Sequence, residues 1–268
     1  MTIAITDKEF ALFQRFIYDA AGITMAPSKK ALVMSRLSKR LDLRKLPSFA
    51  EYFKVLSSGQ DAQEVQVAID LLTTNETYFF REPKHFDLLR EQAELARGRS
   101  QPFRVWSAAC STGEEPYSIA MVLAATLQNT PFEILGSDIS SRVLERARTG
   151  HYPLSRTTHT PKQYLQQFCL RGTGAQEGTV LVDKPLRDRV RFMQVNLNTT
   201  LPKLGPFDFV FLRNVMIYFS SDTKRQVVER VLSTLKPGGY LLIGHSETLN
   251  DLNASAVAVA PSIYRRPQ

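Results

Sequence analysis

The chain has 268 residues, of which 43% are hydrophobic and 22% charged, and its formal net charge is +8 at neutral pH. It has no apolar run near the roughly 18 residues that a spanning helix needs and no signal core at its N-terminus, so we expect a cytoplasmic globular protein without membrane insertion. The positive charge favours an acidic partner, whether nucleic acid, anionic lipid or a protein surface.

Residues 1–72 predict an all-helical domain of four helices. Thr6 and Glu9 form a capping box ahead of an apolar helical face, and Gly22 ends this first helix. Polar residues precede the other three apolar stripes and are expected to cap them. These expected caps are Ser28, Ser48 and Asp61.

The second of these helices is almost uniformly positive between residues 29 and 45, where Asp42 is the one acid. We expect its basic side chains to face water, either as an ordinary solvated surface or as a docking surface for an acidic partner. No aromatic residue interrupts this stretch, so a stacking platform for single-stranded nucleic acid is not indicated. An acidic helix or a phosphate backbone is favoured instead. The candidate docking residues are Arg36, Lys39, Arg40 and Arg44.

Residues 73–99 predict a linker and a helix. The segment 73–83 (TTNETYFFREP) passes from polar to aromatic to charged residues, and Pro83 suits the first turn of the helix that follows. A segment that crosses between domains and closes over a ligand would have this composition.

The stretch 103–120 organises the rest of the chain. It predicts a strand, a tight loop that ends at Gly113, and a helix that opens at residues 114–116. A second buried strand ends at Asp138, where a carboxylate can bind a ribose diol. With one glycine and two glutamates, the loop disfavours a pyrophosphate and favours a cationic cofactor such as S-adenosylmethionine. Cys110 fits this turn as a small structural side chain, and the two cysteines have no metal-ligand spacing.

Strand and helix signals alternate over residues 100–150 and again from residue 190, which predicts a parallel sheet. Between about 153 and 191 the rhythm breaks, and glycine-punctuated strand-like pieces predict a small inserted β-subdomain. Residues 256–264 are expected to add one antiparallel closing strand.

Several strings in this order resemble the CheR family, the chemotaxis-receptor protein-glutamate methyltransferases. The most specific are residues 111–117 (STGEEPY) and 213–219 (RNVMIYF). The others are residues 74–82 (TNETYFFRE), 106–109 (WSAA), 137–139 (SDI), 196–197 (NL), 235–239 (LKPGG) and 244–247 (GHSE). The resemblance covers nearly the whole chain.

This resemblance implies an α/β fold, a seven-stranded doubly wound, Rossmann-like methyltransferase domain over residues 100–268, preceded by the helical receptor-recognition domain and the linker. It implies S-adenosylmethionine as cofactor and S-adenosylhomocysteine as product. The implied cofactor contacts are Asn75, Thr77, Arg81, Glu115, Asp138, Asn196, Leu197, Arg213 and Asn214. Arg81 and Tyr218 would lie beside the reacting methyl group.

The chemistry that the resemblance implies needs little from the protein beyond positioning. A glutamate carboxylate is already ionised at neutral pH and needs no general base. It must be held about 3 to 3.5 Å from the methyl carbon for an in-line displacement. Arg81 can orient the carboxylate and the Tyr218 hydroxyl can donate a second hydrogen bond. His245 is interpreted as structural or pocket-lining.

The implied partner is the acidic helical cytoplasmic region of chemoreceptors, which the basic helix would steer. The loop at residues 171–178 also resembles that of family members whose β-subdomain docks a receptor C-terminal peptide. Two other classes stay open: a nucleic-acid methyltransferase, supported only by the positive charge, and a non-catalytic cofactor-binding adaptor. Residues 213–216 differ from the Asn-Pro-Pro-Tyr loop of base methyltransferases, and we expect no nucleic-acid partner.

Overall fold

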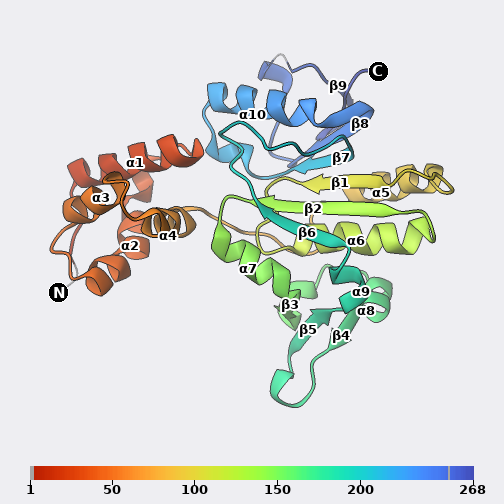
Figure 1. The fold of residues 1–268 in the computed structure, drawn as a ribbon, viewed down its shortest axis with the longest axis horizontal. Helices are drawn as coiled ribbons and strands as arrows, with labels where there is room; N and C mark the ends of the chain where they lie inside the picture. The colour runs from red at the N-terminus through yellow and green to blue at the C-terminus, as the bar shows by residue number, and fades with distance from the viewer. Residues whose placement is uncertain (1–2, 253) are drawn as a thin grey trace.

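The computed structural model describes residues 3–252 and 254–268. It consists of a helical N-terminal domain, an α/β domain, and a small sheet that extends from the α/β domain (Figure 1). The predicted fold class, a doubly wound α/β domain preceded by an all-helical domain, is confirmed. Within the described residues, no helix is both long enough and apolar enough to cross a membrane.

The N-terminal domain contains α1 (Asp7–Ala21), α2 (Lys30–Arg44), α3 (Phe49–Ser57) and α4 (Ala62–Leu72). Its core gathers apolar side chains of all four helices, including Phe13, Leu37 and Phe49. The capping box at Thr6 is confirmed, and the side chains of Ser48 and Asp61 cap α3 and α4 as predicted.

The predicted cap at Ser28 is wrong. A short 3-10 helix, η1 (Pro27–Lys29), precedes α2, and the backbone N–H of Lys30 donates to the carbonyl of Pro27. This extra turn is tightened by backbone hydrogen bonds, so α2 begins without a side-chain cap.

The main sheet has the strand order β6-β2-β1-β7-β8-β10-β9. Its strands are β1 (Phe103–Ser107), β2 (Phe132–Asp138), β6 (Val190–Gln194), β7 (Phe207–Leu212), β8 (Leu235–Ile243), β9 (Val257–Ala260) and β10 (Ile263–Arg265). β1 pairs in parallel with both β2 and β7, so the strand order reverses at this point. In open α/β sheets, ligands bind at the carboxyl ends of the strands beside such a reversal.

The C-terminal end differs from the expected single closing strand. Two antiparallel strands form there: β10 pairs with β8, and β9 pairs with β10 at the edge of the sheet. The chain reverses at Ser262, whose backbone is left-handed with φ +60°. Pro261 and Ser262 mark this turn in the sequence, and the expectation of a single strand passed over that signal.

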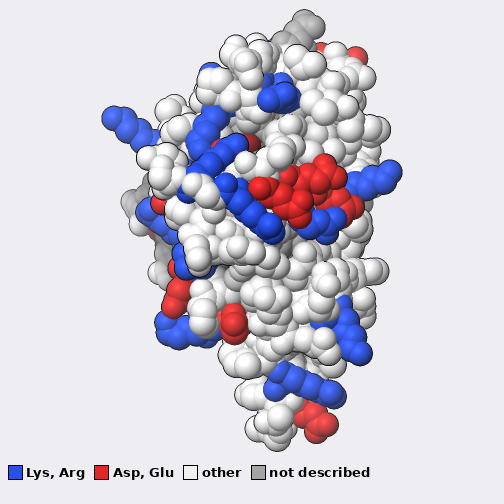
Figure 2. Space-filling model, turned by 90° about the vertical axis from the view of Figure 1, so that its right-hand side faces the viewer, with Lys and Arg blue, Asp and Glu red and all other residues white. Residues whose placement is uncertain are grey.

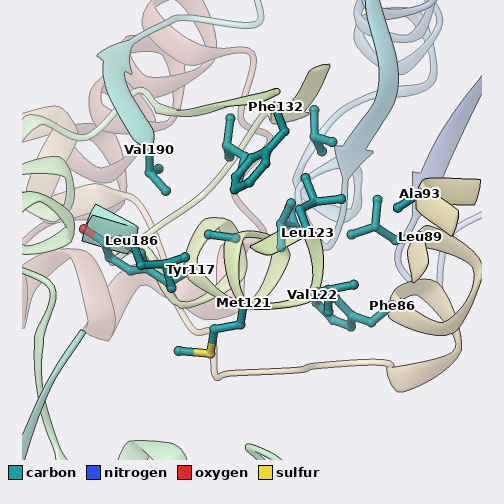
Figure 3. Close-up of a cluster of buried hydrophobic side chains, with 14 of the residues drawn as sticks. Phe86, Leu89, Ala93, Tyr117, Met121, Val122, Leu123, Phe132, Leu186 and Val190 are labelled. Carbon is teal, nitrogen blue, oxygen red and sulfur yellow. The ribbon is translucent and has the colours of Figure 1, made fainter. Parts of the chain in front are cut away.

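Helices cover both faces of the sheet. α5 (Pro83–Leu95) and α6 (Glu114–Leu127) pack on one face, where Phe86, Leu89 and Met121 belong to the core that Figure 3 shows. α10 (Ser221–Ser233) covers the other face through Val227 and Val231. α7 (Ser141–Thr149) follows β2. The two cores hold the sheet rigid beneath the loops at its carboxyl edge.

The inserted β-subdomain lies between α7 and β6. It contains a three-stranded antiparallel sheet in the order β3-β5-β4, formed by β3 (His151–Pro153), β5 (Thr179–Val182) and β4 (Cys169–Arg171). Its helices are α8 (Lys162–Phe168) and α9 (Lys184–Arg187), with 3-10 turns η2 (Leu154–Thr157) and η3 (Gly174–Gln176). The Tyr152 hydroxyl donates to the carbonyl of Thr112 at 2.7 Å, so the insert supports the loop after β1.

Hydrogen bonds join the helical domain to the α/β domain. The carboxylate of Asp70, at the end of α4, accepts hydrogen bonds from the N–H of Ser141 at 3.0 Å and of Arg142 at 3.3 Å. These N–H groups belong to the first turn of α7, where a negative charge is stabilising. Across the same junction, the N–H of Thr24 donates to the carbonyl of Tyr218 at 2.7 Å. Residues of both domains therefore form the rim of one cavity.

Candidate active site

A cavity of about 390 Å³ lies where the carboxyl ends of β1, β2, β6 and β7 meet the linker and the helical domain. All nine predicted cofactor residues line it, and so does Tyr218. Of the predicted docking residues, Arg36, Lys39, Arg40 and Arg44, none lies in its wall. The positions of the sheet and the linker thus bring together residues separated by more than 100 positions in sequence.

Asp138 ends β2 and is buried, with 7% of its surface exposed. Its Oδ2 accepts a hydrogen bond from the N–H of Ser111 at 2.9 Å, and its Oδ1 accepts one from the N–H of Ser140 at 3.0 Å. Burial raises the pKa of Asp138, whereas these two hydrogen bonds act in the opposite direction. The carboxylate is therefore fixed in orientation, and each oxygen keeps a further lone pair for a ligand.

Hydrogen bonds join the linker to the loop after β1 and to the helix that follows it. The Ser111 hydroxyl donates to the carbonyl of Asn75 at 2.8 Å, and the N–H of Phe80 donates to the Ser118 hydroxyl at 3.0 Å. These contacts hold the linker residues Asn75 and Thr77 over the cavity.

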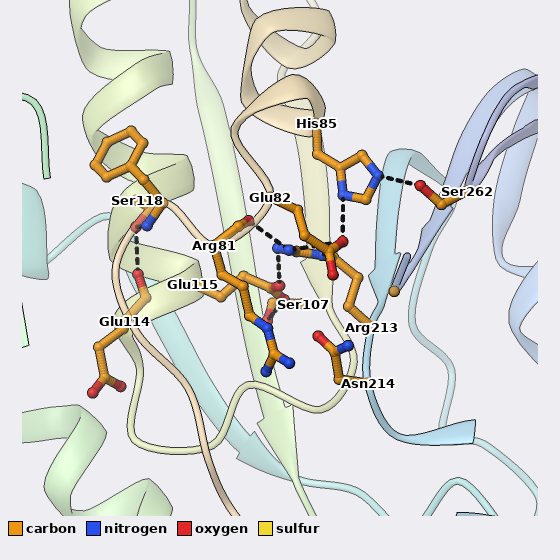
Figure 4. Close-up of polar contacts among 12 residues, drawn as sticks. Arg81, Glu82, His85, Ser107, Glu114, Glu115, Ser118, Arg213, Asn214 and Ser262 are labelled. Atoms are coloured by element: carbon orange, nitrogen blue, oxygen red, sulfur yellow. Dashed lines mark hydrogen bonds and ion pairs between the residues drawn. The ribbon is translucent and has the colours of Figure 1, made fainter. Parts of the chain in front are cut away.

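A buried ion network that includes the cavity-lining residues Arg213 and Glu115 lies beside the linker (Figure 4). The Arg213 guanidinium, 2% exposed, pairs with Glu115 at 2.8 Å and with Glu82 at 3.1 Å, and it donates to the carbonyl of Arg81. Glu115 also accepts from the Ser107 hydroxyl at 2.7 Å. The guanidinium of Arg213 is thus engaged by protein groups at the cavity wall.

Arg81 and Tyr218 meet at the cavity. Arg81 is half-buried and donates to the carbonyl of Glu76 at 3.3 Å. Tyr218 lies in the 3-10 helix η4 (Met216–Tyr218). Burial raises the pKa of Tyr218, and the nearby Arg81 charge acts in the opposite direction. The phenol is therefore protonated at neutral pH and able to donate a hydrogen bond.

The helical domain supplies part of the cavity wall, which the sequence interpretation missed. Ile23, Thr24 and Met25 line the cavity directly after α1. Gly22 turns the chain there with φ +71°, and a Cβ at this position would lie 2.7 Å from Thr223. The Asn196 side chain donates to the carbonyl of Ala20 at 2.7 Å and so joins the two domains. The apolar residues Ile23 and Met25 after Gly22 were the one sequence signal that the chain packs against another part of the protein here.

The expectation that the basic side chains of α2 face water is wrong for three of them. Arg36 donates to the carbonyls of Leu72 and Thr73 at 3.2 and 3.0 Å. Arg40 pairs with Glu64, with Nε to Oε1 at 2.9 Å, and Arg44 pairs with the same carboxylate at 2.9 Å. Lys39 is exposed, as expected.

Glu64 explains this arrangement. Its side chain is 2% exposed, and it also accepts from the Tyr52 hydroxyl at 2.7 Å. Burial alone would raise the pKa of Glu64, but hydrogen bonds from Arg40 and Tyr52 together with the charges of Arg40 and Arg44 hold it below its ordinary value. Residues 1–72 contain ten basic and eight acidic residues, so the domain neutralises most of its own charge.

Positive charge also gathers elsewhere. Figure 2 shows the face of the α/β domain turned away from the helical domain, where Lys and Arg side chains surround an acidic patch. The net charge of +8 is therefore not a property of α2 alone.

Cys110 is buried, and burial raises its pKa well above the ordinary thiol value. This environment suits the structural role that the sequence predicts and disfavours a thiolate nucleophile.

Two family models match the chain: "CheR methyltransferase, all-alpha domain" over residues 8–73 and "CheR methyltransferase, SAM binding domain" over residues 75–263. The chain is 44% identical over 267 residues to a chemotaxis protein methyltransferase of Escherichia coli K12, covering 98% of this chain and 92% of that protein. It is 45% identical over 255 residues to the chemotaxis protein methyltransferase of Salmonella typhimurium LT2, covering 93% and 87%. A distant likeness among solved structures is N-methyltransferase NodS from Bradyrhizobium japonicum WM9 with S-adenosylhomocysteine, at 13% identity, 70% and 88% coverage and a TM-score of 0.39.

The fold, the cavity and the matched SAM-binding domain define a methyltransferase that uses S-adenosylmethionine. The cavity volume lies within the range of about 300–1,000 Å³ typical of cofactor pockets. The chain belongs to the CheR methyltransferase family, which confirms the family suggested by the sequence motifs.

Proposed function

We propose that this protein transfers the methyl group of S-adenosylmethionine to glutamate carboxylates of chemoreceptors in the cytoplasm, giving glutamate methyl esters and S-adenosylhomocysteine. The observation that carries the proposal is the single cavity in which the predicted cofactor residues meet Arg81 and Tyr218. The names of the relatives, chemotaxis protein methyltransferases, support it. The test is transfer of labelled methyl to receptor-containing membranes, with release of the label by mild base.

The cofactor residues fall into three groups around the cavity. Asp138 offers its carboxylate to the ribose diol from the end of β2. Asn75, Thr77 and Arg81 cover the cofactor from the linker. The remaining contacts come from the first turn of α6 and the loops after β6 and β7: Glu115, Asn196, Leu197, Arg213 and Asn214. When bound, the cofactor supplies an electrophilic methyl group on a sulfonium.

Arg81 and Tyr218 position the substrate carboxylate. Two donors that converge on one carboxylate fix its orientation and exclude water from its attacking oxygen. The carboxylate is ionised before it binds, so no residue has to remove a proton. The protonated Tyr218 suits this role because a phenolate would repel the substrate.

Tyr218→Phe is expected to keep the fold and most of the affinity for the cofactor, but to lower kcat about tenfold, because one hydrogen bond of about 1.5 kcal/mol to a charged carboxylate is lost. Single-turnover methylation kinetics together with calorimetric titration of the cofactor separate the two effects. A variant with full turnover would assign Tyr218 to packing.

The proposed receptor-facing surface consists of exposed lysines on and beside α2. Lys29 of η1 lies at the cavity rim, Lys39 is exposed on α2, and Lys45 is exposed directly after the helix. We propose that the acidic receptor helix lies along these residues. Arg36, Arg40 and Arg44 support the surface from beneath because their guanidinium groups hold α2 against α4.

The double variant Lys39→Glu, Lys45→Glu is expected to lower kcat/KM for receptor methylation at least about tenfold, because like charges at an interface cost several kcal/mol. Cofactor affinity should not change, since neither residue lines the cavity. Lys84→Glu, Lys203→Glu is the matched control, because it makes the same change in net charge at exposed positions of the α/β domain. Equal loss in both variants would point to bulk charge rather than a docking surface.

The β-subdomain is proposed to dock a receptor C-terminal peptide by strand addition. Its β4 lies at an edge of the small sheet. The loop after β4 is compact: a Cβ at Gly172 would lie 1.9 Å from the carbonyl oxygen of Gln176, so only glycine fits.

A further inference from the structure

Three potential metal ligands converge on one point outside the cavity. Glu82 and His85 lie at the start of α5, and His245 follows β8. The His85 Nδ1 lies 3.5 Å from Glu82 Oε2, and the His245 Nε2 lies 3.8 Å from the same oxygen. All three donor atoms lie within 4.8 Å of one another. Ligands at about 2.1 Å from a tetrahedral ion are roughly 3.4 Å apart, so these separations are near those of a metal site.

Ser262 favours one tautomer of His85. Its hydroxyl oxygen lies 2.6 Å from the carbonyl oxygen of Pro261 and 2.9 Å from the His85 Nε2, and it has one proton to donate. When the hydroxyl donates to the shorter contact, its oxygen accepts from Nε2, so the proton of the neutral ring is on Nε2 and Nδ1 presents a bare lone pair. Figure 4 shows this ring between Ser262 and Glu82.

This lone pair has no hydrogen-bond partner among the described residues, although His85 is 0% exposed. A buried acceptor that faces a carboxylate oxygen is unfavourable, because both groups carry negative potential. A cation between the two atoms removes this repulsion and satisfies both.

The surrounding groups already orient the ligands. The backbone N–H of His245 donates to Glu82 Oε1 at 3.1 Å, and Arg213 holds Oε2. A metal-binding histidine usually donates its other ring N–H to a fixed acceptor, as His85 does to Ser262. The charge of Arg213 does not close the site to a cation, because Arg213 also pairs with Glu115 and two carboxylates thus face one guanidinium.

We infer that Glu82, His85 and His245 form a binding site for a divalent transition-metal ion such as Zn²⁺, with the fourth position open to water. Two imidazoles and one carboxylate are a donor set that suits Zn²⁺. The side chain of His245 is 54% exposed and gives the ion a path from solvent. The ion would join the start of α5 to the loop after β8, and so hold Glu82 beside Arg213.

The test is a titration of the chelator-treated full chain with Zn²⁺, followed by calorimetry, and with Co²⁺, followed by its visible absorption. We expect one ion per chain, a tetrahedral-type Co²⁺ spectrum and a rise in Tm with Zn²⁺. His245→Ala removes an exposed ligand without opening a core, and we expect it to weaken Zn²⁺ binding at least tenfold and to abolish the rise in Tm.

The chain has four histidines, and His151 is exposed in β3, outside this cluster. His151→Ala is therefore the matched control and should bind as the unmodified protein does. The absence of saturable binding in the unmodified protein would overturn the inference. So would equal binding by His245→Ala, or equal losses in both histidine variants, which would indicate adventitious surface coordination.

Discussion

Replacing Glu64 with alanine is expected to lower the free energy of unfolding by about 3 kcal/mol, because it leaves two arginines without their shared, buried carboxylate. Arg40 and Arg44 are partly exposed, so the loss in the free energy of unfolding should lie at the lower end of the range for broken buried ion pairs. Since the folded-state pKa of Glu64 lies below its ordinary value, the stabilisation is complete above the unfolded pKa of about 4.3 and is lost as the pH falls through the folded value.

Denaturant unfolding followed by circular dichroism measures this effect. Glu51→Ala is the control, because Glu51 is a partly exposed helical glutamate of the same domain that pairs with Lys54 on the surface. It should change stability by less than about 0.5 kcal/mol. Equal effects of the two substitutions would contradict a structural role for the Glu64 cluster. Reversing Arg36, Arg40 and Arg44 to glutamate would place negative charge against Glu64, so it tests folding rather than docking.

Asp138→Ala is expected to weaken cofactor binding by about 1 to 3 kcal/mol, or roughly 5- to 150-fold, because the ribose hydroxyls lose their acceptor. The N–H groups of Ser111 and Ser140 also lose their acceptor, so the loop that faces the cofactor becomes less fixed. Calorimetric titration with S-adenosylhomocysteine measures the affinity directly, without turnover.

Asp208→Ala is the control that distinguishes a loss of cofactor affinity from a general loss of stability. Asp208 also accepts a backbone hydrogen bond, from the N–H of Arg104 at 2.8 Å, and pairs with Lys236, but it does not line the cavity. It should reduce stability and leave cofactor affinity unchanged. Unchanged affinity in Asp138→Ala would remove this carboxylate from the proposed cofactor contacts.

The sequence was sufficient for features that depend on local patterns. A buried strand followed by a carboxylate placed Asp138 at the end of β2, and polar residues ahead of apolar stripes located the caps at Thr6, Ser48 and Asp61. The grouping of the site residues followed from the motifs, because parallel strands bring their carboxyl ends to one edge.

Features that depend on tertiary contacts were not predictable. The charges of α2 look unpaired in the sequence because their partner, Glu64, lies on α4 and looks like an ordinary N-terminal helix residue. Arg213 matched a cofactor motif, yet its guanidinium is held by Glu82 and Glu115, far apart in sequence. The part of the cavity wall formed by Ile23 and Met25 could not be predicted, because it depends on how the helical domain is placed on the α/β domain.

The most direct test of the proposed function supplies methyl-labelled S-adenosylmethionine to the purified protein with receptor-containing membranes, and in parallel with RNA. We expect label on the receptor that mild base releases as methanol, with the signal greatly reduced in Asp138→Ala at low cofactor concentration. Base-stable label on RNA, or no transfer to either acceptor by a protein that binds the cofactor, would rule out receptor glutamate methylation.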